Sequence, residues 1–485
     1  MSFVRGLLPV RRGERGLAAF LFGFLTLMVL ADWLGKIGAD SLFVKRLGVE
    51  YVPLMYVVTP VVMLVTSALI FAFVDRIRGR TLLLGYVTLV AVASVAIQIA
   101  IPIGGIVLPI AYVFAHGVKE TIYLLFWIYA GSLYDSEQSK RLFPIFAAAV
   151  LVGKIAGGAI AAAVVDTIHS ENLMGTQAVG FAVCIALVAL WWKRLPDPGR
   201  GPADRRVEPR DLRRTLAGAS AVARDDLLRG FGIGIFLWYF LMQIGSYLYL
   251  VGLDVSSLLR DSRQSEDLFS QLYASVYTTS TIAALALQLL VAGPLVRRLG
   301  VAKSLFVLPL WYLLSYGAAL VAFSFFAAVA IQLGERIVIP ALHRPASEIV
   351  YTQVADDARA RARAFLSGGV NAAGNIAAAL LLIATTALGS STAVILAVAT
   401  ACSALFLANA GWLRGAIGRR LAANLMSPDA SLRRNAIFML PNEADAVPAE
   451  ALEEIASHGD RESAEAARWA LARRGTLAAV GAVHD

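Results

Sequence analysis

The chain has 485 residues, of which 58% are hydrophobic and 16% charged, and its mean hydropathy is +0.70. A soluble protein of this length cannot bury so much apolar surface, so the composition excludes an ordinary soluble domain. The net charge of +9 does not indicate nucleic-acid binding, because the basic residues lie between long apolar runs, where they orient a membrane protein.

These apolar runs divide the chain into about twelve segments, each long enough to cross a bilayer as a helix. We therefore predict an all-α polytopic membrane protein. No cleavable signal peptide is expected, since the first run lacks a small-residue cleavage site and leads directly into charged residues. The approximate boundaries of the predicted spans are 17–43, 51–74, 81–103, 107–133, 144–166, 175–193, 229–253, 269–296, 302–323, 325–353, 364–388 and 391–413.

Basic residues gather at every second boundary between these spans. They precede span one and follow spans two, four, six, eight, ten and twelve, whereas the alternate loops hold only Lys45, Arg46, Arg260 and Arg263. Cytoplasmic loops are enriched in Lys and Arg. The alternation therefore predicts a protein of the plasma (inner) membrane, with both termini and the central loop in the cytoplasm.

Three charged residues lie four positions apart in the first span: Asp32, Lys36 and Asp40. In a helix they share one face, as neighbours of opposite charge. Charge inside a span is costly and usually faces a bundle interior or a water-filled cavity. This set is the first candidate for handling a solute or ion, and a structural salt bridge that locks the helix is the alternative.

The segment between spans six and seven is polar and rich in Pro and Gly, which predicts a linker. The flanking halves resemble each other weakly, since each carries a basic turn after its second span, at 75–80 and at 293–300. Two parallel six-helix halves joined by a cytoplasmic linker form the plan of a major-facilitator-type transporter. We predict the halves at 1–193 and 229–415, with the linker at 194–228.

The remaining segment, 416–485, turns polar from Ser427 onward. Its predicted helix starts are Asp429, Pro448 and Asp460, and the apolar stripes that follow are Leu432, Ala436, Ile437 and Leu440, then Ala464, Ala467 and Leu471. Similar segments about 31 residues apart resemble HEAT-like helical repeats. So few repeats are marginal alone, so we expect residues 427–485 to pack against the cytoplasmic face of the bundle or to bind a cytoplasmic protein partner.

Other spans carry a few charged side chains. Glu120 follows His116 on one face of span four, and Lys154 lies among small residues of span five, where it is either a pathway residue or reaches the cytoplasmic surface. Span ten holds Glu335, and it also places Arg336, Pro340, Arg344 and Glu348 at the spacing of one helix face, with a kink expected at the proline. The alternative for Arg344 and Glu348 is pairing with loop charges.

Three stretches of the chain form a combined pattern. They are Asp40-Ser41-Leu42-Phe43 with Gly48, Glu50 and Pro53; Phe126-Trp127 followed by Glu137, Lys140, Arg141, Phe143, Pro144 and Phe146; and Tyr351-Thr352 followed by Arg359, Arg361, Arg363 and Phe365. The pattern resembles the bacterial and plastid nucleotide transporter family, which comprises ATP/ADP translocases and NTP/NDP exchangers. The resemblance covers most of residues 15–415 and implies a transporter that exchanges nucleotides.

We therefore predict a secondary transporter that works by alternating access on a small anionic solute, with the lipid bilayer as its surroundings. The predicted substrate-binding residues are Lys36, Asp40, Trp127, Lys154, Arg336 and Arg344. The residues predicted to gate or to carry protons are Asp32, Glu120, Glu335 and Glu348. Trp127 is either a stacking platform or a membrane-interface anchor. The sequence offers no nucleophile–base pair and no metal-ligand spacing, so neither an enzyme nor a cofactor or metal is expected.

Two other functions stay open. Ala39 stands where the nucleotide exchangers carry a cation, and a nucleotide phosphate favours several basic partners. This difference favours a proton-coupled transporter of a lipid or another organic solute. The third hypothesis is a scaffold or sensor that does not transport and uses the HEAT-like tail to hold a partner.

Overall fold

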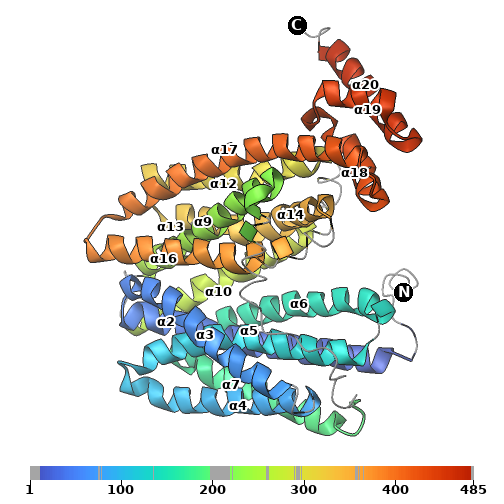
Figure 1. Ribbon diagram of the computed structural model, residues 1–485. Helices are drawn as coiled ribbons and strands as arrows, with labels where there is room; N and C mark the ends of the chain where they lie inside the picture. Colours follow the sequence, from blue (N-terminus) through green and yellow to red (C-terminus); the bar gives the residue numbers. More distant parts are fainter. Residues whose placement is uncertain are drawn as a thin grey trace. The chain divides into compact units, whose positions relative to one another are not determined.

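The computed structural model is helical through the part of the chain that it describes (Figure 1). The described residues contain helices, turns and bends and no strand, which confirms the predicted all-α class. They are residues 11, 13–74, 77, 79–134, 136–196, 219–220, 222–257, 262–288, 290, 295, 298–355, 359, 361–363 and 365–481.

Each predicted span corresponds to one helix or to a run of consecutive helical segments. The first eight are α2 (Arg15–Arg46), α3 (Val52–Val74), α4 (Gly79–Ala100), α5 (Val107–Leu133), α6 (Ser136–Ile168), α7 (Leu173–Trp191), α9 (Asp226–Ser257) and α10 (Ser262–Leu287). The last four are α12 (Val301–Val321), the run α13 (Phe325–Leu333), η5 (Gly334–His343), α14 (Arg344–Val350) and η6 (Tyr351–Gln353), then η7 (Phe365–Val370) with α16 (Asn371–Ala387), and α17 (Thr392–Leu425).

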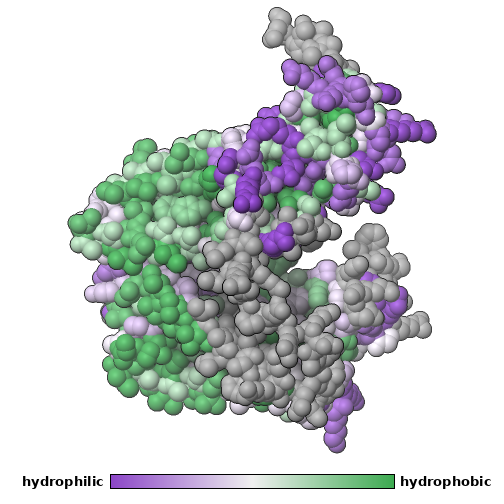
Figure 2. All heavy atoms as spheres, in the orientation of Figure 1, coloured by the Kyte–Doolittle hydropathy of each residue, from purple (hydrophilic) through white to green (hydrophobic). Residues whose placement is uncertain are grey.

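Apolar composition is what makes these helices suited to a membrane. Within the described residues, nine helical segments are long and apolar enough to cross a bilayer. α10 is not among the nine, and the first turns of α10 carry the buried polar residues Ser265, Glu266, Asp267 and Ser270. Figure 2 shows apolar residues over the helices of the bundle, while hydrophilic residues gather on the C-terminal helices.

The chain divides into two compact units. Unit 1 comprises Met1–Val207 and Leu250–Ile282, so it includes the end of α9 and most of α10. Unit 2 comprises Glu208–Tyr249 and Ala283–Asp485. The division into halves at 1–193 and 229–415 stays a prediction.

Helix α2 is the most enclosed element of unit 1. It packs against α5, α6 and α7, and an unbroken buried stretch runs from Ala31 to Val44. A helix that is apolar all round belongs in the interior of a bundle. The three charged residues of this stretch, Asp32, Lys36 and Asp40, are therefore held away from lipid, within reach of groups on the neighbouring helices.

Unit 2 departs from regular α-helix in span ten. The segment η5, Gly334–His343, is a π-helix that contains Pro340. Proline lacks an N–H and its ring displaces the carbonyl one turn earlier, which fits the wider π-helical backbone here, and the kink expected at Pro340 stays a prediction. A π-helix has more residues per turn than an α-helix. The predicted common face of Arg336, Arg344 and Glu348 therefore does not follow from four-residue spacing, because this segment interrupts it.

The C-terminal segment, residues 427–481, is called the tail below and folds onto unit 2. Its helices are α18 (Ala430–Glu443), η8 (Ala444–Ala446), α19 (Ala449–His458) and α20 (Arg461–Gly481). The predicted helix starts Asp429 and Pro448 are the N-caps of α18 and α19, and the third, Asp460, directly precedes α20 and accepts a hydrogen bond from the Ser463 N–H at 2.8 Å. One hydrophobic core runs from α12 and α17 into the tail, and its tail members include Ala436, Leu440, Leu452, Ile455 and Ala467.

Candidate functional site

The centre of unit 1 holds a buried ion pair between Lys36 and Asp40. The Lys36 Nζ lies 2.5 Å from Asp40 Oδ2 and donates a second hydrogen bond to the Tyr273 hydroxyl of α10 at 3.0 Å. Asp40 is only 2% exposed. Buried charges need partners of opposite sign and further hydrogen bonds, and this pair has both. Asp32 lies two turns before Asp40 on α2 and is buried as well.

A histidine from α5 completes the surroundings of the Asp40 carboxylate. The Nε2 atom of His116 lies 2.8 Å from Asp40 Oδ1, so the two carboxylate oxygens have different partners. The His116 ring stacks on Tyr112 with 4.2 Å between ring centroids, and Tyr112 in turn contacts Phe43. Histidine is the side chain whose ordinary pKa allows it to gain and lose a proton near neutral pH. The carboxylate of Asp40 thus lies between the ammonium of Lys36 and a side chain of the type that can change its charge.

The second lysine of the site, Lys154, reaches the same region from α6. Its Nζ lies 5.4 Å from the centre of the Trp33 ring, and the Lys36 Nζ lies 5.6 Å from the same ring. Trp33 also contacts Tyr277 of α10, with 4.0 Å between ring centroids. Two ammonium groups against one indole ring form a cationic, aromatic surface.

Glycines in α6 allow Lys154 to come so close. A Cβ atom on Gly157 would lie 2.9 Å from the Leu30 carbonyl oxygen and 3.0 Å from the Trp33 Cβ, and one on Gly153 would lie 2.6 Å from the Thr26 carbonyl oxygen. Small residues at four-residue spacing let helices approach closely inside membranes. The stretch is ordinary α-helix, and its glycines pack against α2 on either side of Lys154.

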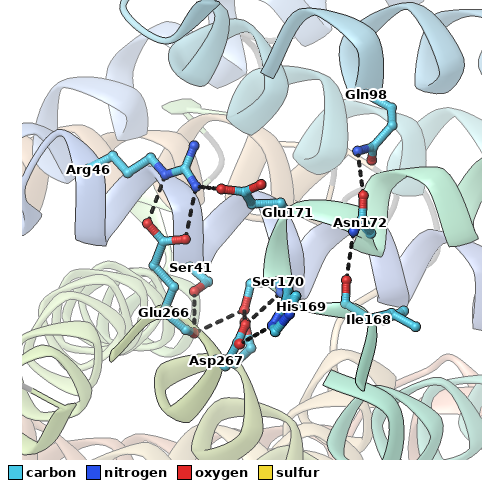
Figure 3. A network of polar contacts seen from close by, with 11 residues as sticks. Ser41, Arg46, Gln98, Ile168, His169, Ser170, Glu171, Asn172, Glu266 and Asp267 are labelled. Atoms are coloured by element: carbon cyan, nitrogen blue, oxygen red, sulfur yellow. Dashed lines mark hydrogen bonds and ion pairs between the residues drawn. The ribbon is translucent and has the colours of Figure 1, made fainter. Parts of the chain in front are cut away.

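A second polar network lies at the end of α2 (Figure 3). The Arg46 guanidinium binds both carboxylate oxygens of Glu266, at 2.8 and 3.0 Å, and also pairs with Glu171. The neighbouring Lys45 pairs with Asp254 at 2.8 Å. Two-pronged pairing of arginine with a carboxylate is stronger and more directional than a single contact. These contacts tie the end of α2 to α9, to α10 and to the turn between α6 and α7.

The next residue of α10, Asp267, holds that turn directly. Its Oδ1 accepts hydrogen bonds from the backbone N–H and the hydroxyl of Ser170, at 2.7 and 2.8 Å, and its Oδ2 lies 2.7 Å from His169 Nδ1. His169 has a positive φ of 64°, a conformation that costs energy for a residue other than glycine. The contacts of Asp267 thus hold a strained turn in place, and Figure 3 shows Glu266 and Asp267 side by side in this network.

Substituting Arg46 by lysine is expected to destabilise unit 1 by about 1–3 kcal/mol, because one ammonium cannot satisfy two carboxylates in this geometry. Thermal unfolding of the purified protein measures the change. The matched control is Arg229→Lys at the exposed pair with Asp226, where an exposed ion pair contributes little and no shift in Tm is expected. Equal shifts for both variants would contradict the structural importance of the Arg46 network.

In unit 2, the predicted residues of span ten lie in different surroundings. Glu335 accepts hydrogen bonds from the Ser246 hydroxyl at 3.0 Å and from the Gln332 amide at 2.7 Å. The guanidinium carbon of Arg336 lies 5.3 Å from the centre of the Tyr249 ring. Arg344 is exposed, and Glu348 pairs with Arg363 at 2.6 Å, with both side chains about half exposed. The partner of Glu348 is thus an arginine that follows span ten in the chain, and the roles predicted for Arg344 and Glu348 stay predictions.

Two predicted residues of unit 1 stand apart from the triad. Trp127 contacts Phe126 and Phe143 edge-on in an aromatic cluster, and its role in substrate binding stays a prediction. Glu120 lies in α5, but its side chain is outside the part of the structure that is described.

Sequence reasoning missed several residues that the fold brings to α2. His116 was noticed only as a neighbour of Glu120, whereas Tyr273, Glu266 and Asp267 were not considered at all. The signal for Glu266 and Asp267 was the run Ser265-Glu266-Asp267, which is unusually polar for a segment that enters a buried helix, whereas nothing local indicates Tyr273. Their partners are more than 90 residues away in the chain, so no local spacing indicates the pairing.

Comparisons with known proteins give a fold but no relative by sequence. A scan of protein-family models and a search of curated proteins both found no match. Among solved structures, a POT family transporter in complex with 5-aminolevulinic acid is similar at a TM-score of 0.54 and 14% identity, covering 81% of this chain and 96% of that chain. The nucleoside transporter NupG is similar at 0.53 and 16% identity, covering 84% and 98%.

The human organic anion transporter MFSD10 (TETRAN) is similar at a TM-score of 0.50 and 17% identity, covering 83% of this chain and 100% of that chain. The chain therefore has the fold of major-facilitator-like transporters, and this fold is that of a multi-pass membrane protein. The resemblance to the nucleotide transporter family and the HEAT-like character of the tail stay predictions.

Proposed function

We propose that the chain is a secondary transporter that carries a small organic anion across the membrane by alternating access, coupled to a proton. The fold supports a transporter, and the named substrates of the similar structures are small organic solutes. The observation that carries the proposal is the buried triad Lys36–Asp40–His116, because it unites an anion-binding group with groups that accept protons.

The coupling follows from competition for Lys36. In the observed state Asp40 neutralises the Lys36 ammonium. A carboxylate of the substrate can take that place only if Asp40 loses its negative charge or turns fully to a protonated His116, since two carboxylates around one ammonium repel each other. Either route takes up one proton with each anion. Lys154 and the Trp33 ring would hold the remainder of the substrate.

Charge balance limits the number of negative charges that the site accepts. The residues placed here are two lysines, Lys36 and Lys154, and two aspartates, Asp32 and Asp40, so their formal charges cancel. A monoanion that arrives with one proton adds no net charge and keeps this balance. Nucleotide exchange of the ATP/ADP type is the second candidate, and the Trp33 ring beside two lysines supports it. The phosphates of a nucleotide, however, carry more negative charges than the two lysines can neutralise.

The orientation is proposed from the sequence. The loop charges place both termini and the basic ends of the spans in the cytoplasm of an inner-membrane protein. In this orientation, the triad and the Arg46 network lie toward the outer end of α2, and the tail lies on the cytoplasmic side.

Purified protein in proteoliposomes tests the proposal. Labelled monocarboxylates, amino acids and dipeptides are offered with and without an inward pH gradient, and labelled ATP is offered to vesicles loaded with ADP. Uptake of an organic anion that rises with the gradient supports proton coupling. Exchange of ATP for ADP that does not depend on the gradient would support the second candidate, nucleotide exchange, in place of proton-coupled anion transport. If the protein takes up none of these solutes, the proposal of a transporter is overturned.

Asp40→Asn is expected to separate anion binding from proton coupling. The amide keeps the shape of the carboxylate but leaves Lys36 available to the substrate at every pH, so exchange of labelled for unlabelled substrate continues. Accumulation driven by a pH gradient falls at least about tenfold, because the variant cannot take up the coupled proton. The control is Asp254→Asn, which removes the partner of Lys45 outside the triad and should keep the gradient dependence. Full gradient-driven accumulation by Asp40→Asn would exclude Asp40 as the coupling group.

A further inference from the structure

The tail supplies the N-terminal cap of a membrane-spanning helix. Glu443, the last residue of α18, is 3% exposed, and its Oε1 accepts hydrogen bonds from the backbone N–H groups of Val301 and Ala302, the latter at 3.0 Å. These are the first N–H groups of α12, which have no partner within their own helix. A carboxylate there also meets the positive end of the helix dipole.

The chain before α12 is shaped for this contact. Gly300 has a φ of +81°, a conformation that residues with a side chain rarely adopt. A Cβ atom at this position would lie 2.6 Å from Glu443 Oε1 and 2.6 Å from the Asn442 carbonyl oxygen. Glycine is therefore needed both for the turn and for the close approach of α18. The exposed pair of Lys303 and Asp445, at 3.1 Å, lies beside this contact.

The same tail helix is attached to the end of span ten. The Asn435 amide of α18 donates to the Thr352 carbonyl at 3.1 Å, and the Gln353 amide lies 2.9 Å from the Met439 sulfur. The Asn424 amide of α17 donates to the backbone carbonyl and to the side-chain oxygen of Gln353, each at 3.0 Å. One buried layer of amides thus joins α18 to η6 and to α17.

These attachments restrain a span whose helix is interrupted by an irregular segment. Span ten contains the π-helix η5 with Pro340, which has no backbone N–H to donate, so this segment lacks one hydrogen bond of a regular helix, and π-helical turns occur frequently at functional sites. Only the short helix α14 separates this segment from η6. Because α18 holds η6 to the ends of α12 and α17, any bending at η5 has to pull against the tail.

We propose that the tail acts as a brake, by which we mean that it slows the bending of the π-helical segment of span ten. Its helix α18, which Glu443 and Gly300 fasten to α12, does so by holding the end of span ten. As far as it concerns the transport rate, this inference rests on the proposed function. The restraint on span ten is a property of unit 2 and is measurable without transport. Releasing the Glu443 contact should loosen residues 351–353 and speed the transport cycle.

Three variants distinguish the loss of the Glu443 contact from a general loss of structure. Glu443→Ala removes the cap, and Gly300→Ala displaces α18 while keeping the carboxylate. Glu443→Gln keeps an oxygen that accepts both N–H groups. Burial raises the pKa of the Glu443 carboxyl, although the N–H groups of Ala302 and Val301 oppose this shift, so a neutral acceptor should hold the contact at least as well as the carboxylate. Asp445→Asn, at the exposed neighbouring pair, is the matched control.

Hydrogen–deuterium exchange of the protein in nanodiscs is the first measurement. Glu443→Ala and Gly300→Ala should increase exchange about tenfold at residues 301–305 and 351–354, whereas Glu443→Gln and Asp445→Asn should leave it unchanged. Unchanged exchange at 351–354 in both loosened variants would overturn the brake. Circular dichroism and thermal unfolding establish that the bundle of each variant is folded.

Transport in proteoliposomes is the second measurement. If the tail is a brake, the two loosened variants transport at least about twofold faster than wild type, at an unchanged substrate concentration for half-maximal rate. Looser exchange with an equal or lower rate would mean that the tail supports the cycle, and would overturn the brake. Wild-type protein that transports nothing, with the exchange pattern as expected, would overturn the proposed function and leave the restraint on span ten intact.

Discussion

Substituting Lys36 by methionine is expected to reduce uptake of the transported anion at least about 100-fold. In the structure, Lys36 donates to Asp40 and Tyr273, and it is the group on which the substrate anion would replace Asp40. Removing one partner of a buried ion pair costs about 3–5 kcal/mol, because the remaining charge stays in a medium of low polarity. Initial rates of uptake into proteoliposomes measure the loss.

A double variant distinguishes a transport role from a structural one. Lys36→Met combined with Asp40→Asn removes both charges, so the Tm should return toward that of wild type while uptake stays lost. If Lys36 only locks α2 in place, uptake should return together with stability. Lys36→Arg keeps the charge but changes its shape, and an intermediate rate is expected, since a guanidinium reaches two oxygens of one carboxylate.

The second large effect is expected for Gly157→Val. The added side chain would collide with the Leu30 carbonyl oxygen and the Trp33 Cβ, which are backbone or backbone-proximal atoms that cannot turn aside. Overpacking a close contact costs about 1–3 kcal/mol and more when backbones have to separate. We expect a Tm lower by several degrees, together with slower uptake, because Trp33 and Lys154 would move apart.

Gly85→Val is the control for that variant. Gly85 lies in α4 with open space around its Cβ position, so it tests the change of residue type without a collision. Thermal unfolding in detergent compares the two proteins. A Tm for Gly157→Val equal to that of Gly85→Val would mean that α2 and α6 do not approach as closely as the structure has them.

The positions of the spans were predictable because they depend on local properties. Long apolar runs have to be helical in lipid, and the turns between them contain residues such as Gly48, Gly104 and Gly300, which adopt positive φ. The pairing of Lys36 with Asp40 was equally local, since residues four apart in a helix are neighbours. Asp429 and Pro448 were identified as helix starts for the same reason, because capping is decided within a few residues.

The remainder of the candidate site depends on contacts between distant parts of the chain. Nothing near Asp40 in the sequence indicates His116, and nothing near Arg46 indicates Glu266, because helix packing decides both pairings. The expected common face of span ten stays a prediction, since four-residue spacing assumes an unbroken α-helix and η5 is a π-helix. The sequence shows only that small residues surround Lys154, whereas the structure shows that Gly153 and Gly157 determine how closely α6 approaches α2.

The two adjacent carboxylates at the start of α10 have a consequence for any displacement that would open unit 1 at this end. Glu266 binds Arg46 on α2, whereas Asp267 binds His169 and Ser170 in the turn before α7. Because both belong to one turn of one helix, a displacement that breaks the first contact also strains the second. Opening should therefore be cooperative, with closed and open populations and few molecules in between. Single-molecule fluorescence across this end of unit 1 should then show two discrete levels, not a continuous drift.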